Sequence, residues 1–183
     1  MATTEWLSKV VDGEFLVEKH SYSNQDDVFT VSTSDATYYL KIASDLKAER
    51  HNIERLEPYL LVPKVVGFDS VNGVDHLLMS EVPGKNLAEL VGVWTNEVIV
   101  KEFARAIRTL HNVDTIILFP KDTRPGLVLL HGDMALPNIA TQQGSSGYVD
   151  LGKMVLGAPD LDLTDAMWSL QRNIGPGYGE LLL

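Results

Sequence analysis

The segment at positions 131–138 reads His-Gly-Asp-Met-Ala-Leu-Pro-Asn, and it contains residues whose types and spacing could do chemistry. Asn138 follows Asp133 by five positions, and Asp150 comes twelve positions later in the sequence Tyr-Val-Asp-Leu-Gly. Phosphoryl transfer from Mg-ATP requires a carboxylate that orients the attacking hydroxyl or accepts its proton, and hard oxygen ligands for the metal. We therefore predict that Asp133 faces the attacking hydroxyl and that Asn138 and Asp150 bind Mg²⁺.

Each of these two motifs alone is also typical of an ordinary turn. A His-Gly-Asp sequence can form a turn with no catalytic role, and the side chains of Asn138 and Asp150 can bond to their own backbone. The order of the two motifs, their β-type flanks and the strand-then-helix pattern before them favour the catalytic interpretation.

A kinase also needs a lysine on a strand to hold the nucleotide phosphates, and a glutamate on the next helix to fix that lysine. Lys41 lies in an alternating segment at 37–42, and a helical pattern follows at once. Glu49 lies in that pattern, with Glu54 as a second candidate. We predict that Lys41 binds the α- and β-phosphates and pairs with Glu49.

The elements that must position these residues are short strands followed by helices. Apolar and polar residues alternate at 14–18, 28–31 and 37–42. Two more strand-like segments, at 64–68 and 75–79, are joined by Asn72-Gly73, a strong hairpin signal. The spacing at 44–59 is helical, with Ser44 or Asp45 placed to cap the helix. We expect an antiparallel sheet of about five strands with one helix.

The pattern changes from strands to helices at Pro83-Gly84. A helix is clearest at 96–113, and one of its faces is apolar, formed by Ile99, Phe103, Ile107 and Leu110. Short extended segments are expected at 126–130, 139–141 and 148–149, a hairpin turn at 142–147 and a last helix at 161–172. This organisation predicts an α+β protein with a β-rich lobe at 1–82 and a mainly helical lobe at 83–183.

Composition excludes several classes of protein. The chain of 183 residues has 15 basic and 25 acidic side chains, and its net charge of −10 argues against nucleic-acid binding and favours cationic partners. The absence of cysteine excludes disulfides, thiolate metal sites and thiol nucleophiles. Neither an export signal nor a membrane span is indicated, so we expect a cytoplasmic protein with no membrane partner. The oligomeric state is left open.

In these motifs and their order the sequence resembles the aminoglycoside phosphotransferase family, the small-molecule branch of the protein-kinase-like fold. The resemblance extends from about position 14 to position 175, and the 3′-phosphotransferases that modify kanamycin-type antibiotics look nearest. It implies a bilobal fold and an ATP- and Mg²⁺-dependent kinase that phosphorylates a drug hydroxyl. Such an enzyme confers antibiotic resistance, because the modified drug no longer binds the ribosome. The implied substrate is a polycationic aminoglycoside, which suits an acidic chain.

The resemblance gives Asp133, Lys41 and the metal ligands the roles stated above, and it adds further residues. The segment at 77–84 resembles the interlobe hinge, so Met79 would line the adenine pocket while main-chain atoms of Ser80 and Val82 bond the base. His131 would support the catalytic loop structurally. Asp162 would be the structural aspartate that opens the following helix.

Some parts of the sequence differ from the family's pattern. Only residues 114–130 separate the long helix from His131, where the family has a helical insertion, and the family continues with further helices beyond the position of Leu183. Asn173 stands where the nearest relatives have an aspartate that binds a drug amine, and an amide cannot make that charge pair. We therefore expect a reduced second lobe.

Two smaller differences concern groups near the phosphates. The segment at 21–27, which should close over them, contains no glycine, and Lys153 stands where the family usually has arginine. Two alternatives to an active aminoglycoside kinase remain open. One is a shortened, nucleotide-binding remnant without turnover, and the other is a kinase of another small hydroxylated metabolite.

Overall fold

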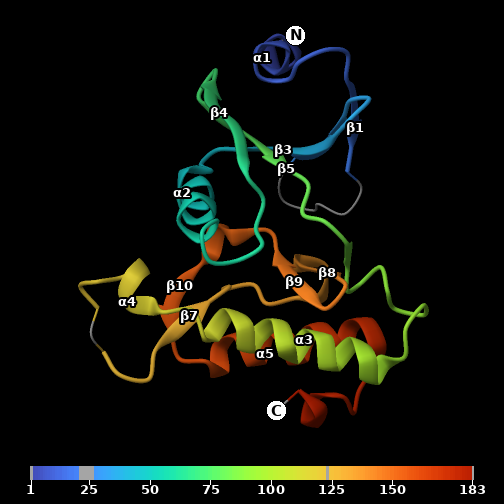
Figure 1. Cartoon of the computed structure of the whole chain (residues 1–183), viewed down its shortest axis with the longest axis vertical. Helices are drawn as coiled ribbons and strands as arrows, with labels where there is room; N and C mark the ends of the chain where they lie inside the picture. The colour runs from blue at the N-terminus through green and yellow to red at the C-terminus, as the bar shows by residue number, and fades with distance from the viewer. Residues whose placement is uncertain (1, 21–26, 123, 183) are drawn as a thin grey trace. The chain divides into compact units, whose positions relative to one another are not determined.

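The computed structural model describes residues 2–20, 27–122 and 124–182. The chain divides into two compact units (Figure 1). The first consists of Met1–Glu54 and Pro63–Glu81, and the second of Arg55–Val62 and Val82–Leu183. Each unit is described by itself below.

A five-stranded antiparallel sheet forms the first unit, in the order β1-β2-β3-β5-β4. Its strands are β1 (Leu16–Lys19), β2 (Asp27–Ser32), β3 (Thr37–Ala43), β4 (Val65–Val71) and β5 (Val74–Ser80). The predicted five strands are therefore confirmed. The β4–β5 hairpin turns at Asn72 and Gly73, whose φ angles of 55° and 81° are both positive. Asn-Gly is preferred there because it tolerates this conformation.

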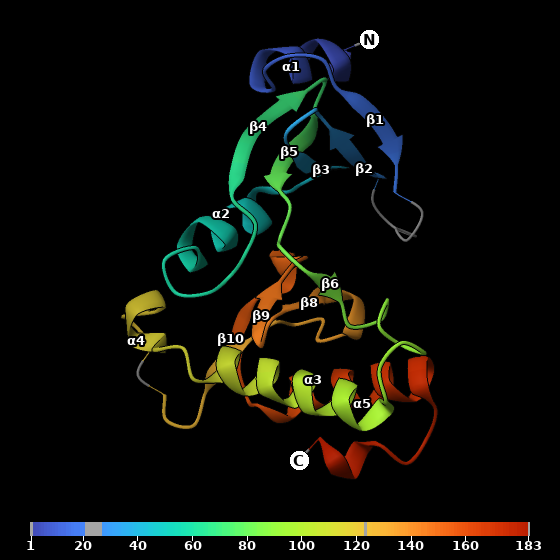
Figure 2. The ribbon, with the colours of Figure 1, turned by 45° about the vertical axis from the view of Figure 1, so that its right-hand side comes forward.

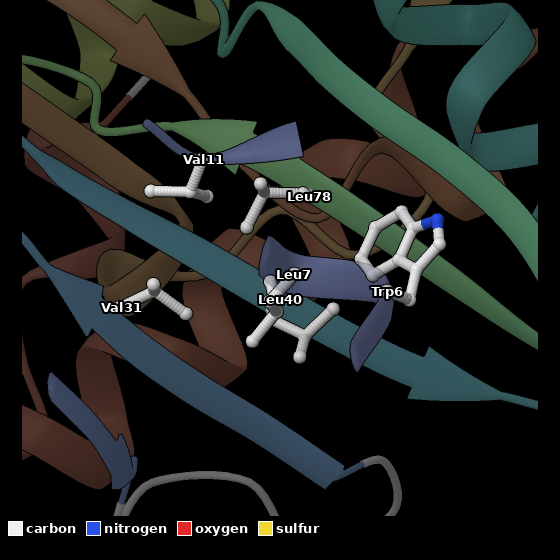
Figure 3. Close-up of a cluster of buried hydrophobic side chains, with 6 residues drawn as sticks. All are labelled: Trp6, Leu7, Val11, Val31, Leu40 and Leu78. Carbon is white, nitrogen blue, oxygen red and sulfur yellow. The ribbon is translucent and has the colours of Figure 1, made fainter. Parts of the chain in front are cut away.

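Helix α1 (Ala2–Val10) was not predicted from the sequence. It covers one face of the sheet, where Trp6 and Leu7 of the helix pack with Leu40 of β3 and Leu78 of β5 (Figure 3). The contact with β4 is close, since a Cβ at Gly67 would lie 3.2 Å from the Trp6 ring. Packing of this kind stabilises a nine-residue helix that would be marginal alone.

Helix α2 (Lys47–Leu56) follows β3, as predicted, although it begins three residues later than the helical spacing suggested. Of the two candidate caps, Asp45 is the one used, because its Oδ1 accepts a hydrogen bond of 3.1 Å from the backbone N–H of Lys47. The glutamate predicted to face Lys41 lies in the first turn of this helix.

Two long helices, α3 (Asn96–His111) and α5 (Asp160–Ile174), lie side by side in the second unit (Figure 2). Thr95 caps α3 by accepting from the backbone N–H of Val98, and the predicted apolar face of α3 is buried. The shorter elements are α4 (Thr115–Leu118), the 3₁₀ helices η1 (Leu136–Asn138), η2 (Leu151–Lys153) and η3 (Gly179–Leu181), and the strands named next. No helix in the described part of the chain has the length and apolar character needed to cross a membrane.

Five short strands form two small sheets in the same unit. One pairs β7 (Val128–Leu130) with β10 (Val155–Gly157), and the other has the order β6-β8-β9, from Lys85–Asn86, Ile139–Gln142 and Ser145–Tyr148. The predicted turn at 142–147 is confirmed in position but is shorter. Only Gln143 and Gly144 lie between β8 and β9, and both have a positive φ. The residues on either side of them, Gln142 and Ser145, already pair as strand neighbours.

The contacts of α1 predict that it contributes to the stability of the first unit. Replacing Trp6 by alanine should lower the free energy of unfolding by about 3 kcal/mol, because it leaves a cavity between α1 and the sheet. Glu5→Ala, on the exposed side of the same helix, is the matched control and should change it by less than about 0.5 kcal/mol. Urea unfolding followed by tryptophan fluorescence and circular dichroism measures both. Equal stabilities of the two variants would contradict the role of α1.

Candidate functional site

The first unit holds a buried ion pair between β3 and α2. Lys41 Nζ lies 2.8 Å from Glu49 Oε2, and the two side chains are only 9% and 4% exposed. The second candidate, Glu54, instead pairs with Arg50 on the half-exposed side of α2. The structure therefore brings Lys41, expected to hold the nucleotide phosphates, into contact with Glu49, the partner predicted for it, and not with Glu54.

Three hinge residues were predicted to contact adenine. Met79 and Ser80 end β5, and the Met79 side chain is buried. The backbone N–H of Ser80 donates to the carbonyl of Lys64 at 2.9 Å, and its hydroxyl accepts from the backbone N–H of Lys64. The amide of Ser80 is thus already bonded within the sheet, so its carbonyl is the main-chain group to consider for the base. Val82, also buried, belongs to the second unit.

The segment at 131–138, which was predicted to be the catalytic loop, begins where β7 ends. Gly132 has a φ of 78°, and a Cβ there would collide with the carbonyl oxygen of Lys153. Glycine is required on both counts, because it alone adopts this φ freely and allows such a close approach. The turn at Gly132 leads the chain out of β7 and into Asp133.

Asp162 anchors this turn from the first turn of α5. It is fully buried, and its carboxylate accepts from the backbone N–H groups of His131 at 2.9 Å and Gly132 at 3.1 Å. The ring of His111, at the end of α3, lies 3.0 Å from the same carboxylate. Burial opposes ionisation, but these hydrogen bonds outweigh it and hold the pKa of Asp162 below its usual value. Asp162 is therefore suited to hold the loop.

His131 connects the loop to the segment before Asp150. Its side chain is fully buried, and Nε2 lies 2.9 Å from the carbonyl oxygen of Val149, so this nitrogen carries the proton and donates. Burial lowers the pKa of the His131 imidazole, against the opposing effects of Asp162 and the Val149 carbonyl. The ring is neutral in this setting and serves as a structural link.

Asn138 and Asp150 lie at the same end of the β8–β9 hairpin. Asn138 directly precedes β8, and its carbonyl accepts from the backbone N–H of Val149 at 3.0 Å. Its side-chain Nδ2 donates to the carbonyl of Asp133 at 2.9 Å, which directs the amide oxygen the other way. Asp150 follows in a left-handed conformation, with φ 59° and ψ 56°. Non-glycine residues in the left-handed conformation occur often at functional sites.

These two residues fit a Mg²⁺ site that is completed by substrate. An amide oxygen and a carboxylate are hard donors, and Mg²⁺ is commonly held by one or two protein groups with water and phosphate oxygens in the other positions. Within the part of the chain that is described, no group of three or more His, Cys, Asp or Glu side chains converges to hold a metal alone. The donor set is thus of the kind that binds Mg²⁺ together with nucleotide phosphates.

Lys153 and His111 contact the predicted site residues, although the sequence assigned neither a role. Lys153 Nζ lies 2.8 Å from Asp133 Oδ2, and this hydrogen bond raises the pKa of the Lys153 amine. The only signal for Lys153 was its position after Asp-Leu-Gly, where it replaces arginine. His111 carried no signal, because a histidine at a helix end is also common on surfaces.

Three segments in which the sequence differs from the family's pattern can be compared with the structure. Between 114 and 130 the described residues contain one helix, the four-residue α4, before β7. The amide of Asn173 is used within α5, where it donates to the carbonyl of Ser169 at 2.8 Å. Of the phosphate-covering segment at 21–27, residues 21–26 lie outside the described residues.

The sequence was compared with those of known proteins. No protein-family profile matches the chain. Aminoglycoside 3′-phosphotransferases from Niallia circulans and Enterococcus faecalis are each 24% identical to it. The first alignment covers 95% of this chain and 87% of the relative, and the second 92% and 85%.

Solved structures with similar folds are also aminoglycoside phosphotransferases. The enzyme APH(4)-Ia superimposes with a TM-score of 0.73 at 11% identity, covering 94% of this chain and 80% of its own. APH(3″)-Id from Streptomyces rimosus, solved with ADP and streptomycin, has a TM-score of 0.73 at 19% identity and covers 100% and 89%. The predicted α+β, protein-kinase-like fold is confirmed, and so is the resemblance to aminoglycoside phosphotransferases.

The burial of His131 predicts a pH-dependent stability. Below its ordinary pKa of about 6.5, the imidazole binds a proton in the unfolded chain but resists it in the folded protein. The free energy of unfolding should therefore fall as the pH drops below about 6.5, by up to about 1.4 kcal/mol per pH unit, until the lowered pKa is reached. Urea unfolding between pH 8 and pH 5 measures this slope.

His131→Gln is the matched variant, since its amide can donate to Val149 without titrating. It should be less stable than the wild type at pH 8, and its stability should fall less steeply below pH 6.5. Identical slopes for the two proteins would show that His131 titrates normally.

Proposed function

We propose that the protein is an ATP- and Mg²⁺-dependent kinase that transfers the γ-phosphoryl group to a hydroxyl of an aminoglycoside antibiotic. The observation that carries this proposal is the loop at 131–138, held by Asp162 and His131 so that Asp133, Asn138 and the end of the β8–β9 hairpin are adjacent. The similarity to aminoglycoside 3′-phosphotransferases over 95% of the chain supports the choice of acceptor class.

The residues proposed to bind the nucleotide are those that the sequence pattern indicated. Lys41, paired with Glu49, would contact the α- and β-phosphates, and Met79 would line the adenine pocket. The carbonyl of Ser80 and the main chain of Val82 would bond the base. The streptomycin complex of APH(3″)-Id also contains ADP, which supports nucleotide binding by this fold.

Asp133 would be the catalytic base in the transfer. The acceptor oxygen forms a bond to the γ-phosphorus as the bond to the β,γ-bridging oxygen breaks, ADP leaves, and the hydroxyl proton passes to the Asp133 carboxylate. Mg²⁺, held by Asn138 and Asp150, would offset the negative charge of the phosphates. Lys153 adds a positive charge 2.8 Å from Asp133 Oδ2.

The acceptor class is supported by charge and by the relatives. A chain with a net charge of −10 attracts a polycation at long range. A structure of an APH(4)-Ia variant contains hygromycin B, and a structure of APH(3″)-Id contains streptomycin. The proposal includes a cytoplasmic enzyme, since phosphorylation would protect ribosomes from the drug, and it includes no nucleic-acid or membrane partner.

Substitution of the catalytic base gives the first test. Asp133→Asn should lower the rate of phosphorylation at least about 100-fold, because an amide cannot accept the proton, while the Kd for ATP changes little. A coupled ADP-release assay measures the rate, and isothermal titration calorimetry with Mg-ATP measures the affinity. Glu54→Gln, on the exposed side of α2, is the control and should retain full activity. Retained turnover in Asp133→Asn would refute the assignment.

A panel of acceptors distinguishes the proposed function from its alternatives. With Mg-ATP, we expect ADP release with kanamycin and neomycin and none with amino alcohols or simple sugars. Turnover on those metabolites alone would identify another small-molecule kinase. No turnover, combined with a raised melting temperature in Mg-ATP, would identify a nucleotide-binding remnant.

A further inference from the structure

We propose that Asp75 is a positioning residue that holds the first turn of α2, so that Glu49 stays in contact with Lys41. The expected effect of Asp75 on ATP binding rests on the proposed function, whereas the expected effect of Asp75 on the Lys41–Glu49 pair does not. The argument uses only residues of the first unit.

Asp75 and Lys41 lie on the same face of the sheet. In the antiparallel pair of β3 and β5, Lys41 is opposite Leu77 and Ala43 is opposite Asp75. Directly opposed residues point to the same face, and successive residues alternate between faces. Leu40 and Leu78 pack under α1 and mark the opposite face, so Asp75 lies on the face that carries Lys41.

The carboxylate of Asp75 connects three segments. It is only 3% exposed, its Oδ2 accepts from the backbone N–H of Leu46 at 3.0 Å, and its Oδ1 accepts from the hydroxyl of Ser70 on β4. Leu46 directly precedes α2, and its carbonyl accepts a helical hydrogen bond of 2.9 Å from the backbone N–H of Arg50. One buried side chain therefore ties the start of the helix to the sheet.

This attachment determines where Glu49 lies. Glu49 is the third residue of α2, within one turn of Leu46, so its height and direction follow from the place at which that turn is fixed. The turn is held at two points, by Leu46 on Asp75 and by Glu49 on Lys41 at 2.8 Å. Displacing the first contact moves the second, because both lie on the same rigid turn.

The hydrogen bond from Leu46 to Asp75 is accepted by a carboxylate, and the cap residue Asp45 does not replace it. Hydrogen bonds from Ser70 and Leu46 hold the pKa of Asp75 below its ordinary value, with smaller effects from Lys47 and His76. The cap residue Asp45 is exposed and lies on the same loop as the helix start, so it moves with α2 and cannot attach it to the sheet. Among the described contacts, Asp75 is the side chain that joins this turn to β5.

The direct test measures the reactivity of Lys41. An amine-reactive acylating reagent is applied to the folded protein, and peptide mass spectrometry follows the labelling of Lys41. Asp75→Ala should raise the labelling rate about tenfold, the equivalent of one charge-assisted hydrogen bond, and Glu49→Gln should do the same by breaking the pair itself. Asp75→Asn should change it much less, because its amide oxygen can still accept from Leu46 while its NH₂ group donates to Ser70.

Val31→Ala controls for general destabilisation. Val31 is fully buried on the α1 side of the same sheet, so this variant loses stability without touching the α2 attachment. Its Lys41 labelling should match the wild type at temperatures where both are folded. Unchanged labelling in Asp75→Ala, or an equal rise in Val31→Ala, would overturn the inference. If Asp75→Ala does not fold, Asp75→Glu displaces the carboxylate by one methylene group, and its labelling decides in the same way.

Calorimetry with Mg-ATP separates this inference from the proposed function. If the wild type binds ATP, Asp75→Ala and Glu49→Gln should each raise the Kd for ATP about tenfold and leave the KM for the acceptor unchanged. If the wild type does not bind ATP, the proposed function is wrong, and the labelling of Lys41 still decides the role of Asp75.

Discussion

In the second unit, the geometry of the loop at 131–138 depends on the buried carboxylate of Asp162. The chain leaves β7 at Leu130, so the backbone N–H groups of the next two residues lose their ladder partners inside the protein. Asp162 accepts hydrogen bonds from both, and the His111 ring lies against the same carboxylate. Backbone groups buried without partners are costly, so this side chain allows a sharp turn where a strand could not continue.

The loop at 131–138 is held by further contacts, one within the loop and two to other segments. His131 bonds the segment before Asp150, Asn138 bonds the carbonyl of Asp133, and Gly132 packs against the backbone of Lys153. These contacts reduce the freedom of Asp133 before any substrate is present. Phosphoryl transfer relies mainly on positioning and charge, so in the proposed reaction these contacts would serve to position Asp133.

The first unit uses a buried charge in a similar way. Lys41 and Glu49 are both desolvated, and such a pair stabilises a fold only when its geometry is well supported. We infer that Asp75 gives this support by attaching the start of α2 to β5. In both units, then, a buried aspartate on one element accepts backbone N–H groups at the start of another segment that carries site residues.

Local patterns were enough to predict much of the fold. Three of the five strands lie in segments that alternate with a period of two residues, Asn72-Gly73 adopts the turn that its residue types favour, and the buried face of α3 follows the helical period. Helix α1 was missed because nine residues carry too little periodic signal, and its stability comes from the sheet beneath it. The two small sheets of the second unit were predicted incompletely for a similar reason, since β6 and β10 have only two and three residues.

By itself, the sequence determined the types and order of the candidate site residues, because the spacing of Asp133, Asn138 and Asp150 is a local property of the chain. It also provided both candidate partners for Lys41. The tertiary structure showed that Glu49, the preferred candidate, is the one in contact with Lys41, and only the structure revealed the contacts made by His111, Lys153 and Asp75. These contacts join residues far apart in the sequence, so they depend on how strands and helices pack, which no local pattern records.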